Sequence, residues 1–377
     1  MDPPCLHIIS LEIPYPPLRG NVSGIFHRIR SLKDAGVDII LHVFYKKFGL
    51  PDELAKYCRT VYLYPRKPMW KITGLQLPLY VQSRRSDQIV DLLCRDKHPI
   101  LFEGLHCLFH FEDPRLADRK KFVRMHNIES RYYGHLGSRE ANLFRKWYYQ
   151  FESSRSKSVE EKLLPMATGV FAISQADNHY LSERKIPSVW IPPFHPYRQV
   201  SSKPGFGEYA LYHGDLSIRE NEASAIFLIR EVFSKLDYPL VIAGFRPGLK
   251  LKKLSEGLDF LTLIDSPPAL QMQEILEKAH VLLLPFSQSN GYKMKILDSL
   301  ARGRHIISNT LIGEANPELA EGLHLTGTSA QDWIERIKSL LQQSFSTQEI
   351  EKRQILFDAV YNNEISVEKM LKEIYTG

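Results

Sequence analysis

The chain has 377 residues, of which 44% are hydrophobic and 24% are charged, and its formal net charge is +6. This length allows two domains with a core each, and the composition is that of a globular protein rather than a disordered one. No stretch approaches the roughly 20 apolar residues that a membrane-spanning helix needs, and the modest positive charge suits phosphorylated or membrane-surface partners without supporting nucleic-acid binding.

The amino terminus and the cysteines bear on where the protein works. The opening segment, MDPPCLHIISLEIP, has no basic region and only a short apolar run, which argues against a secretory signal. Cys5, Cys58, Cys94 and Cys107 lie far apart without metal-ligand spacing, so we expect reduced thiols and no bound metal. Both features indicate a cytoplasmic protein.

Strand-like and helix-like segments alternate along the chain, which predicts an α/β fold with largely parallel sheets. In the first half, a helix is expected over 22–33 and strands over 5–10, 37–45, 60–64, 100–103, 122–125, 169–173 and 189–193. In the second half, strands are expected over 209–213, 240–243, 260–264, 281–284 and 305–308, and the pattern becomes helical after Ser329.

These segments predict two Rossmann-like domains that face one another across a cleft. The expected boundaries are an N-terminal domain over 1–195, a linker rich in Pro and Gly over 196–207, a C-terminal domain over 208–345, and closing helices over 346–377. Ligands of open α/β sheets lie beyond the carboxyl ends of the strands, so polar residues at those ends are the first candidates for function.

The most informative segment covers residues 282–309, LLLPFSQSNGYKMKILDSLARGRHIISN, where a strand leads through a loop into a helix opened by a glycine. Asn290 and Gly291 present backbone N–H groups at the predicted helix N-terminus, where the macrodipole favours an anion. Lys293 and Lys295 add positive charge, and Asp298 is suited to accept hydrogen bonds from sugar hydroxyls. Together they predict a site for a phosphorylated sugar such as a nucleotide-sugar.

Polar residues also follow strands of the first half. Gly20 and Asn21 lie in a loop between a strand and a helix, which allows the backbone to approach a phosphate, although an ordinary turn is the alternative. Glu103 and His106 end the fourth strand, where they either bind acceptor hydroxyls or are a buried Glu and a buried His with satisfied hydrogen bonds. His126 ends the next strand, where a polar residue is costly unless it is solvated or used, so we expect it in the cleft.

Two features of the following segment have two interpretations each. Glu129 either belongs to the acceptor side or complements a helix dipole. An apolar stripe over 143–151 has helical spacing and basic neighbours. It fits a helix that contacts anionic lipid headgroups or, in the interpretation that we favour, a core-facing helix with a solvated basic side.

A family resemblance covers most of the chain. The segment 298–307, DSLARGRHII, resembles the nucleotide-binding signature of group-one retaining glycosyltransferases with the GT-B fold, with Asp298 at the second Glu of their Glu-x7-Glu pair and Asn290 at the first. Residues 291–295, GYKMK, fit the G-x-K-x-K pattern of divergent members. The loop 14–21 is similar to the family's P-x-x-GG loop.

The start of the second half departs from the family. Residues 214–221 resemble the G-R-L-x-x-x-K-N loop, but Asp215 and Glu220 stand where an Arg and a Lys normally bind the pyrophosphate. The leaving diphosphate still needs positive compensation. Arg219 is one replacement, and Lys293 and Lys295 are better ones.

The resemblance implies a metal-independent, retaining glycosyltransferase that moves a sugar from a nucleotide-sugar to a glycan or lipid-linked hydroxyl acceptor in polysaccharide or glycoconjugate assembly. It implies no cofactor besides this co-substrate, an acceptor-side N-terminal domain, a donor-binding C-terminal domain, last helices that pack back on the N-terminal domain, and contact with the inner face of the membrane. The implied catalytic residues are His126, Lys293 and Lys295. The implied donor-binding residues are Gly20, Asn21, His213, Gly214, Arg219, Arg246, Ile264, Asn290, Gly291, Tyr292 and Asp298. The implied acceptor-side residues are Glu103, His106 and Glu129.

Two alternatives stay open. A nucleotide-sugar 2-epimerase has the same fold and needs carboxylates for proton abstraction, for which Glu103 and Glu129 are the candidates. A non-catalytic homologue that binds a nucleotide-sugar or a partner enzyme is suggested by Asn290, Asp215 and Glu220, which replace residues that the family uses. Turnover measurements on variants with Lys293 or Lys295 replaced by alanine would distinguish these alternatives from a glycosyltransferase.

Overall fold

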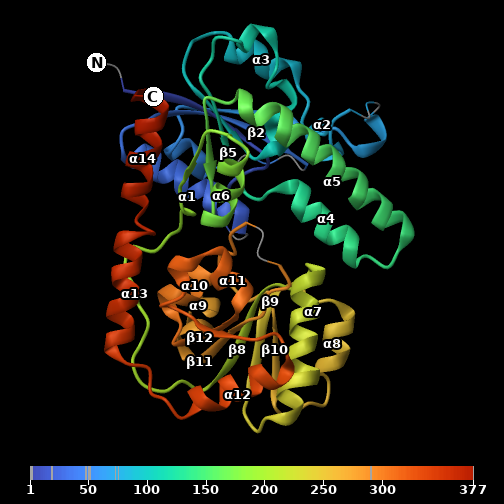
Figure 1. The fold of residues 1–377 in the computed structure, drawn as a ribbon. Coiled ribbons are helices and arrows are strands. Elements are labelled where there is room, and N and C mark those ends of the chain that lie inside the picture. Colours follow the sequence, from blue (N-terminus) through green and yellow to red (C-terminus); the bar gives the residue numbers. More distant parts are fainter. Residues whose placement is uncertain are drawn as a thin grey trace. The chain divides into compact units, whose positions relative to one another are not determined.

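The structure, a computed structural model, describes residues 3–17, 20–46, 49, 52–72, 74, 76–288 and 291–376 (Figure 1). The chain divides into two compact units. The first unit consists of Met1–Pro196, Asn290–Tyr292 and Asn363–Gly377. The second consists of Tyr197–Ser289 and Lys293–Asn362. The chain therefore enters the second unit after Pro196 and returns to the first at Asn363.

The first unit is built on a parallel sheet with the strand order β3-β2-β1-β4-β5-β6-β7. Its strands are β1 (Cys5–Ser10), β2 (Asp38–Tyr45), β3 (Thr60–Pro65), β4 (Ile100–Glu103), β5 (Lys121–Arg124), β6 (Gly169–Ala172) and β7 (Ser188–Trp190). Its helices are α1 (Gly20–Asp34), α2 (Leu79–Gln82), α3 (Asp87–Leu93), α4 (Glu129–Arg139), α5 (Leu143–Leu163), α6 (Gln175–Glu183) and α14 (Asn363–Thr376). Every residue of β1, β4 and β5 is buried, as expected for parallel strands that are covered on both faces.

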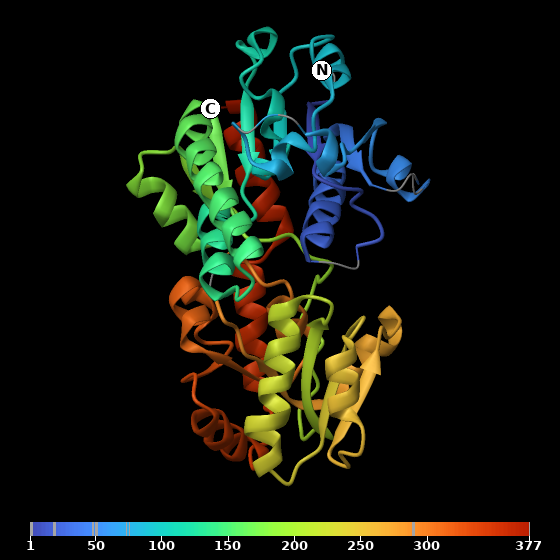
Figure 2. The ribbon, with the colours of Figure 1, turned by 90° about the vertical axis from the view of Figure 1, so that its right-hand side faces the viewer.

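The second unit contains a parallel sheet with the order β10-β9-β8-β11-β12-β13. Its strands are β8 (Tyr209–Asp215), β9 (Leu240–Phe245), β10 (Leu261–Asp265), β11 (Ala279–Leu284), β12 (His305–Asn309) and β13 (His324–Thr326). Its helices are α7 (Arg219–Phe227), α8 (Leu249–Ser255), α9 (Ala269–Lys278), α10 (Lys295–Arg302), α11 (Thr310–Ala315), α12 (Ala330–Leu341) and α13 (Thr347–Ala359). Figure 2 shows α7 lying along this sheet. The short strand β13 was not predicted from the sequence.

Alternation along the strands explains the two covered faces of the second sheet. Val281 and Leu283 of β11 belong to the core cluster that includes Trp333 of α12 and Ala225 of α7. The intervening Leu282 is also fully buried, although it lies outside that cluster. Because successive side chains of a strand point to opposite faces, this pattern places an apolar layer on each side of the sheet.

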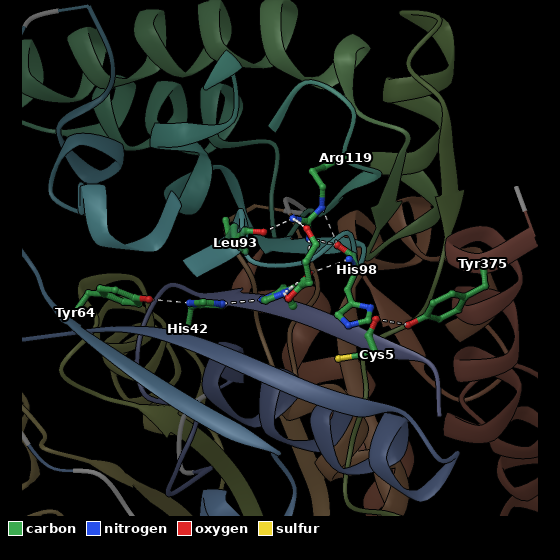
Figure 3. Close-up of polar contacts among 9 residues, drawn as sticks. Cys5, His42, Tyr64, Leu93, His98, Arg119 and Tyr375 are labelled. Carbon is green, nitrogen blue, oxygen red and sulfur yellow. Dashed lines mark hydrogen bonds and ion pairs between the residues drawn. The ribbon is translucent and has the colours of Figure 1, made fainter. Parts of the chain in front are cut away.

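The last helix packs within the first unit. Val367, Met370 and Ile374 of α14 belong to the core cluster of that unit, and the Tyr375 hydroxyl donates a 2.9 Å hydrogen bond to the carbonyl oxygen of Cys5 (Figure 3). Helix α14 therefore contributes to the core of the first unit, where it contacts α1.

A buried chain of polar side chains crosses β1, β2 and β3 (Figure 3). The Tyr64 hydroxyl lies 2.8 Å from His42 Nδ1, His42 Nε2 lies 2.9 Å from His7 Nδ1, and His7 Nε2 lies 3.0 Å from an Asp96 carboxylate oxygen. A carboxylate only accepts, so His7 carries its proton on Nε2, His42 donates from Nε2, and Tyr64 donates to His42. This one arrangement satisfies both imidazoles in their neutral forms.

The sequence prediction was wrong at two places that matter for function. The helix expected to open at Gly291 begins only at Lys295, so Gly291 and Lys293 lie in the preceding loop. In α5, Leu143, Phe144 and Trp147 are 79%, 87% and 66% exposed. The favoured core-facing interpretation of this stripe therefore fails. Across the described part of the chain, no helix combines the length and apolarity needed to cross a membrane.

Candidate functional site

The topology of the second sheet marks where a ligand is expected. Strand order reverses between β8 and β11, because β9 and β10 extend the sheet from one side of β8, while β11 and later strands extend it from the other. In open α/β sheets this switch point forms a crevice at the carboxyl ends of the strands. β8 ends there with Gly214 and Asp215, and the loop after β11 leads into α10, whose first residue is Lys295.

Lys295 projects to this switch point. Its Nζ lies 3.3 Å from Asn221 Oδ1 and 3.5 Å from the Tyr212 hydroxyl. It also lies 4.8 Å from the centroid of the Tyr212 ring and 4.7 Å from that of Phe286. Burial, together with the positive charge of Lys293, lowers the pKa of Lys295 to about 7. An anion bound nearby would raise the pKa of Lys295 and favour its protonated, positively charged form.

His213 is joined to the same helix. Its Nε2 lies 3.0 Å from Ser299 Oγ, and the Ser299 hydroxyl donates a 2.8 Å hydrogen bond to the Lys295 carbonyl oxygen. Because the hydroxyl proton is used in that bond, His213 donates from Nε2. Burial lowers the pKa of His213 to about 3, so its imidazole is neutral. The structure thus brings together His213, Gly214 and Lys295, which were predicted from separate motifs.

Asp298 lies one helical turn after Lys295 and has a partner that the sequence did not reveal. Its Oδ1 accepts a 2.7 Å hydrogen bond from the Tyr197 hydroxyl. Burial raises the pKa of Asp298 to about 6, against the opposing effects of Tyr197 and Arg302. Tyr197 lies in the segment predicted as a linker, a hundred positions away, and no local pattern could have pointed to it.

The remaining predicted donor residues of this unit lie near or beyond the carboxyl ends of β8, β9 and β10. Arg219 is exposed as the first residue of α7, and Arg246 is exposed directly after β9. Ile264 is half-buried near the end of β10. Glu220, at the position of the family's Lys, accepts hydrogen bonds of 2.8 and 2.9 Å from Gln288.

In the first unit, the half-buried His126 and the buried Glu103 form a pair. His126 Nε2 lies 3.0 Å from Glu103 Oε2, and the Arg28 guanidinium pairs with the other oxygen of the same carboxylate. Glu103 and Arg28 are both fully buried. Both carboxylate oxygens are therefore engaged within the protein. This matches the alternative in which Glu103 is buried and satisfied, and its partners are His126 and Arg28.

His106 lies instead beside Glu129. The His106 Nδ1 lies 4.0 Å from Glu129 Oε1, and its ring centroid lies 4.4 Å from that of Tyr80. Burial, reinforced by the negative charge of Glu160, raises the pKa of Glu129 to about 8. Glu129 also begins α4, so it occupies the helix-terminus position that was its alternative interpretation. It is a protonated acid at neutral pH.

The structure describes some, but not all, of the loop residues that were predicted to surround the phosphate. Gly20 is exposed at the start of α1, while the side chain of Asn21 and the whole of Asn290 lie outside the described residues. Gly291 has a positive φ of 64°, and a Cβ there would lie 2.5 Å from the His126 carbonyl oxygen. Gly291 and the half-buried Tyr292 cluster with the first unit, and Lys293 with the second.

Comparison with known proteins adds the family context. Residues 207–343 match the family described as Glycosyl transferases group 1. A Klebsiella pneumoniae protein, described as an uncharacterized 44.6 kDa protein in cps region, is 24% identical over 328 residues, which cover 81% of this chain and 83% of that protein.

Two solved structures share the fold over nearly their whole length. WaaG, a glycosyltransferase involved in lipopolysaccharide biosynthesis, has a TM-score of 0.67 at 14% identity, with coverage of 99% of this chain and 100% of WaaG. Anabaena HepE, solved in complex with UDP and glucose, has a TM-score of 0.65 at 10% identity, with coverage of 99% and 100%.

Proposed function

We propose that this chain, whose residues 207–343 match the family described as Glycosyl transferases group 1 and whose fold is that of GT-B glycosyltransferases, transfers a sugar from a nucleotide-sugar to a hydroxyl group of a glycan or lipid-linked acceptor. The reaction belongs to polysaccharide or glycoconjugate assembly. The genetic setting named for the Klebsiella relative and the pathway named for WaaG support this assignment.

The observation that carries the proposal is the position of Lys295 at the switch point of the second sheet. A nucleoside diphosphate leaves with about two negative charges, and electrostatic stabilisation is often the largest catalytic contribution. Lys295, with its pKa lowered to about 7, regains its proton when a diphosphate lies beside it. Lys293 and the exposed Arg219 add the charge that Asp215 and Glu220 do not provide. No metal is required for this compensation.

The family resemblance implies the chemical step, which retains the anomeric configuration. The bond between the anomeric carbon and the donor phosphate oxygen breaks, and the acceptor oxygen bonds to that carbon from the same face, so configuration is retained. The acceptor proton passes to the departing phosphate. His126, neutral and oriented by Glu103, positions the sugar or the acceptor through its Nδ1 lone pair rather than removing the proton.

The epimerase alternative has less support from the carboxylates. Proton abstraction needs an accessible, ionised carboxylate. Glu103 is fully buried with both oxygens engaged, and Glu129 is held protonated at neutral pH by its raised pKa of about 8. The non-catalytic alternative is decided by turnover alone.

A panel of UDP-, GDP-, ADP- and CMP-sugars tests the proposal through thermal shift and nucleotide release. One donor is expected to stabilise the protein and to release its nucleotide slowly. Lys295→Ala is expected to weaken binding of that donor at least about tenfold, since it removes one charge–phosphate contact, while Lys338→Ala on α12 leaves it unchanged. Binding without release under any acceptor would favour the non-catalytic homologue. Equal binding by Lys295→Ala would contradict the assignment of the diphosphate site.

The exposed stripe of α5 suits a membrane-surface contact on the acceptor side. Leu143, Phe144 and Trp147 are exposed, and Arg145 and Lys146 lie between them, so apolar and cationic groups share one end of the helix. Such a face binds anionic lipid headgroups at the inner surface of a membrane. In vesicle sedimentation with phosphatidylglycerol, Phe144→Ser with Trp147→Ser is expected to lower binding. Trp70→Ser, which removes an aromatic ring that is 83% exposed elsewhere, is the matched control. Equal sedimentation of all variants would contradict this contact.

A further inference from the structure

Three potential metal ligands converge in the second unit, away from the donor residues. His305 begins β12, His324 begins β13, and Glu349 lies in the first turn of α13. One ligand atom from each lies within 4.8 Å of the others. His305 Nδ1 is 3.2 Å from His324 Nε2 and 3.8 Å from Glu349 Oε1. A tetrahedral zinc ion with bonds of about 2.1 Å separates its ligands by about 3.4 Å. Two of these distances are therefore already close to the required value.

The hydrogen bonds of His305 set it in the ligating tautomer. Its Nε2 lies 3.0 Å from the carbonyl oxygen of Gln343, which can only accept. His305 therefore carries its proton on Nε2, and Nδ1 presents a lone pair toward His324 and Glu349. Metal-binding histidines commonly hold their second nitrogen in this way, since the bond to a carbonyl fixes both the tautomer and the ring orientation.

Glu349 is oriented by its helix cap. One carboxylate oxygen, Oε2, accepts from the backbone N–H of Ser346 at 3.0 Å and from its hydroxyl at 3.3 Å. The Ser346 hydroxyl in turn accepts from the Glu349 backbone, which completes a capping box. The cap uses Oε2, and it leaves Oε1 as the oxygen that faces His305.

The neighbouring histidine and arginines have other partners. His280 accepts a 3.2 Å hydrogen bond from the Gly207 backbone and donates a 3.0 Å bond to the Leu340 carbonyl oxygen, so both of its nitrogens are used. Arg353 donates to the Gly303 carbonyl oxygen at 2.7 Å, and Arg336 donates to that of Leu325 at 3.3 Å. Both arginines add positive charge near the imidazoles, which moderates the affinity for a cation.

We propose that His305, His324 and Glu349 bind one zinc ion, with water as the fourth ligand, and that this ion joins β12, β13 and α13. Two imidazoles and a carboxylate are ligands that zinc accepts. His305 and His324 lie at the amino-terminal ends of their strands, whereas the donor residues follow the carboxyl ends. The length of β12 alone separates the two edges by about 13 Å. The ion therefore stabilises the second unit and takes no part in sugar transfer.

The test uses the full chain with any affinity tag removed, dialysed against zinc chloride and analysed for metal content and thermal shift. One equivalent of zinc and a rise in Tm are expected, with no rise in magnesium chloride. Glu349→Gln keeps the capping box but loses the charged ligand, so binding is expected to weaken at least about tenfold. His324→Gln removes a ligand and is expected to abolish the stoichiometric binding. His179→Gln, which changes an exposed histidine 3.3 Å from Glu183, is the matched control and is expected to bind as the wild type.

Cobalt(II) provides a readout that a structural defect does not imitate. Bound in a tetrahedral site of nitrogen and oxygen ligands, it gives visible d–d bands, and these are expected for the wild type and the control but not for His324→Gln. The proposal is overturned if the wild type retains no zinc, or if His324→Gln binds zinc and cobalt as tightly as the wild type. A loss of nucleotide-sugar binding on chelation in the wild type would contradict the structural role.

Discussion

His126 Nε2 lies 3.0 Å from Glu103 Oε2, while Arg28 pairs with the other oxygen of that carboxylate. Burial and the nearby positive charges of Arg28 and Arg124 lower the pKa of His126 to about 3. The neutral ring donates from Nε2 to the carboxylate and presents Nδ1 as an acceptor. A histidine held in this way is suited to receive a hydrogen bond from a sugar hydroxyl.

Glu103→Gln tests this relationship. The glutamine amide can present its N–H₂ to Nε2 and favour the other tautomer, so His126 would lose its defined acceptor. We expect turnover to fall by about a hundredfold, as for other misplaced positioning groups, while donor affinity changes little. A kcat and KM comparison measures this difference. Glu112→Gln, an exposed substitution in the same unit, is the control. Unchanged kcat in a folded variant would show that the pair is only structural.

The pKa of Lys295 predicts a pH dependence of donor binding. Its pKa is about 7 in the free protein, and a bound diphosphate favours the protonated form. Binding therefore takes up a proton above about pH 7, and donor affinity should weaken as pH rises, at most about tenfold per pH unit. Titrations between about pH 6 and 9 measure this slope. Lys295→Arg keeps its charge across this range and should show a flat profile. A flat wild-type profile would mean that Lys295 does not meet the phosphates.

Two glycines are predicted to respond oppositely to alanine. A Cβ at Gly244, at the end of β9, would lie 1.9 Å from the Gly214 carbonyl oxygen, so Gly244→Ala should cost about 3 kcal/mol or more of unfolding free energy. A Cβ at Gly24 in α1 would have its nearest neighbour at 4.0 Å, the Phe194 carbonyl oxygen. Gly24→Ala should therefore stabilise the protein by about 0.5–1 kcal/mol through helix propensity. Denaturant unfolding measures both, and a similar change in the two variants would contradict the prediction.

The buried histidines predict loss of stability in acid. Burial lowers the pKa of His42 to about 3 in the folded chain, whereas an unfolded histidine titrates near pH 6.5. Between these values the unfolded chain binds a proton that the folded chain does not. Stability is therefore complete above about pH 6.5 and is lost as pH falls, by about 1.4 kcal/mol per pH unit for this group.

His42→Gln isolates that contribution. The slope of unfolding free energy against pH, measured between about pH 4 and 6, should decrease by about one proton equivalent relative to the wild type. His27 and His213 keep their own contributions, since their pKa values are also lowered, to about 4 and about 3. The exposed substitution His179→Gln should leave the slope unchanged. An identical slope for His42→Gln would mean that the Tyr64–His42–His7 chain accepts a proton without cost.

The two Rossmann-like halves could be predicted from the amino-acid sequence. Parallel strands that are covered on both faces must be almost wholly apolar, so segments such as 281–284 and 305–308 stand out between amphipathic helices. Strand ends then indicate where polar residues matter, and this reasoning selected His126. Lys295 was selected by its place near a predicted helix N-terminus, and His213 was implied by the family resemblance. The three-residue strand β13 was missed because His324, Leu325 and Thr326 carry too short a pattern. The spacing over 143–151 correctly predicted a helix, which is α5.

The partners of those side chains could not be predicted in this way, because they depend on how distant segments pack in the folded chain. Periodicity shows which residues share a face of a helix, but it does not show whether that face packs on a core. In α5, Leu143, Phe144 and Trp147 of the predicted stripe are exposed. Glu103 is held by Arg28, Asp298 by Tyr197, and His305 faces His324 and Glu349. These partners are 19 to 101 positions apart in the sequence. Such pairs depend on how the elements pack, and the free energy of that packing is distributed over the whole core rather than encoded in any local segment.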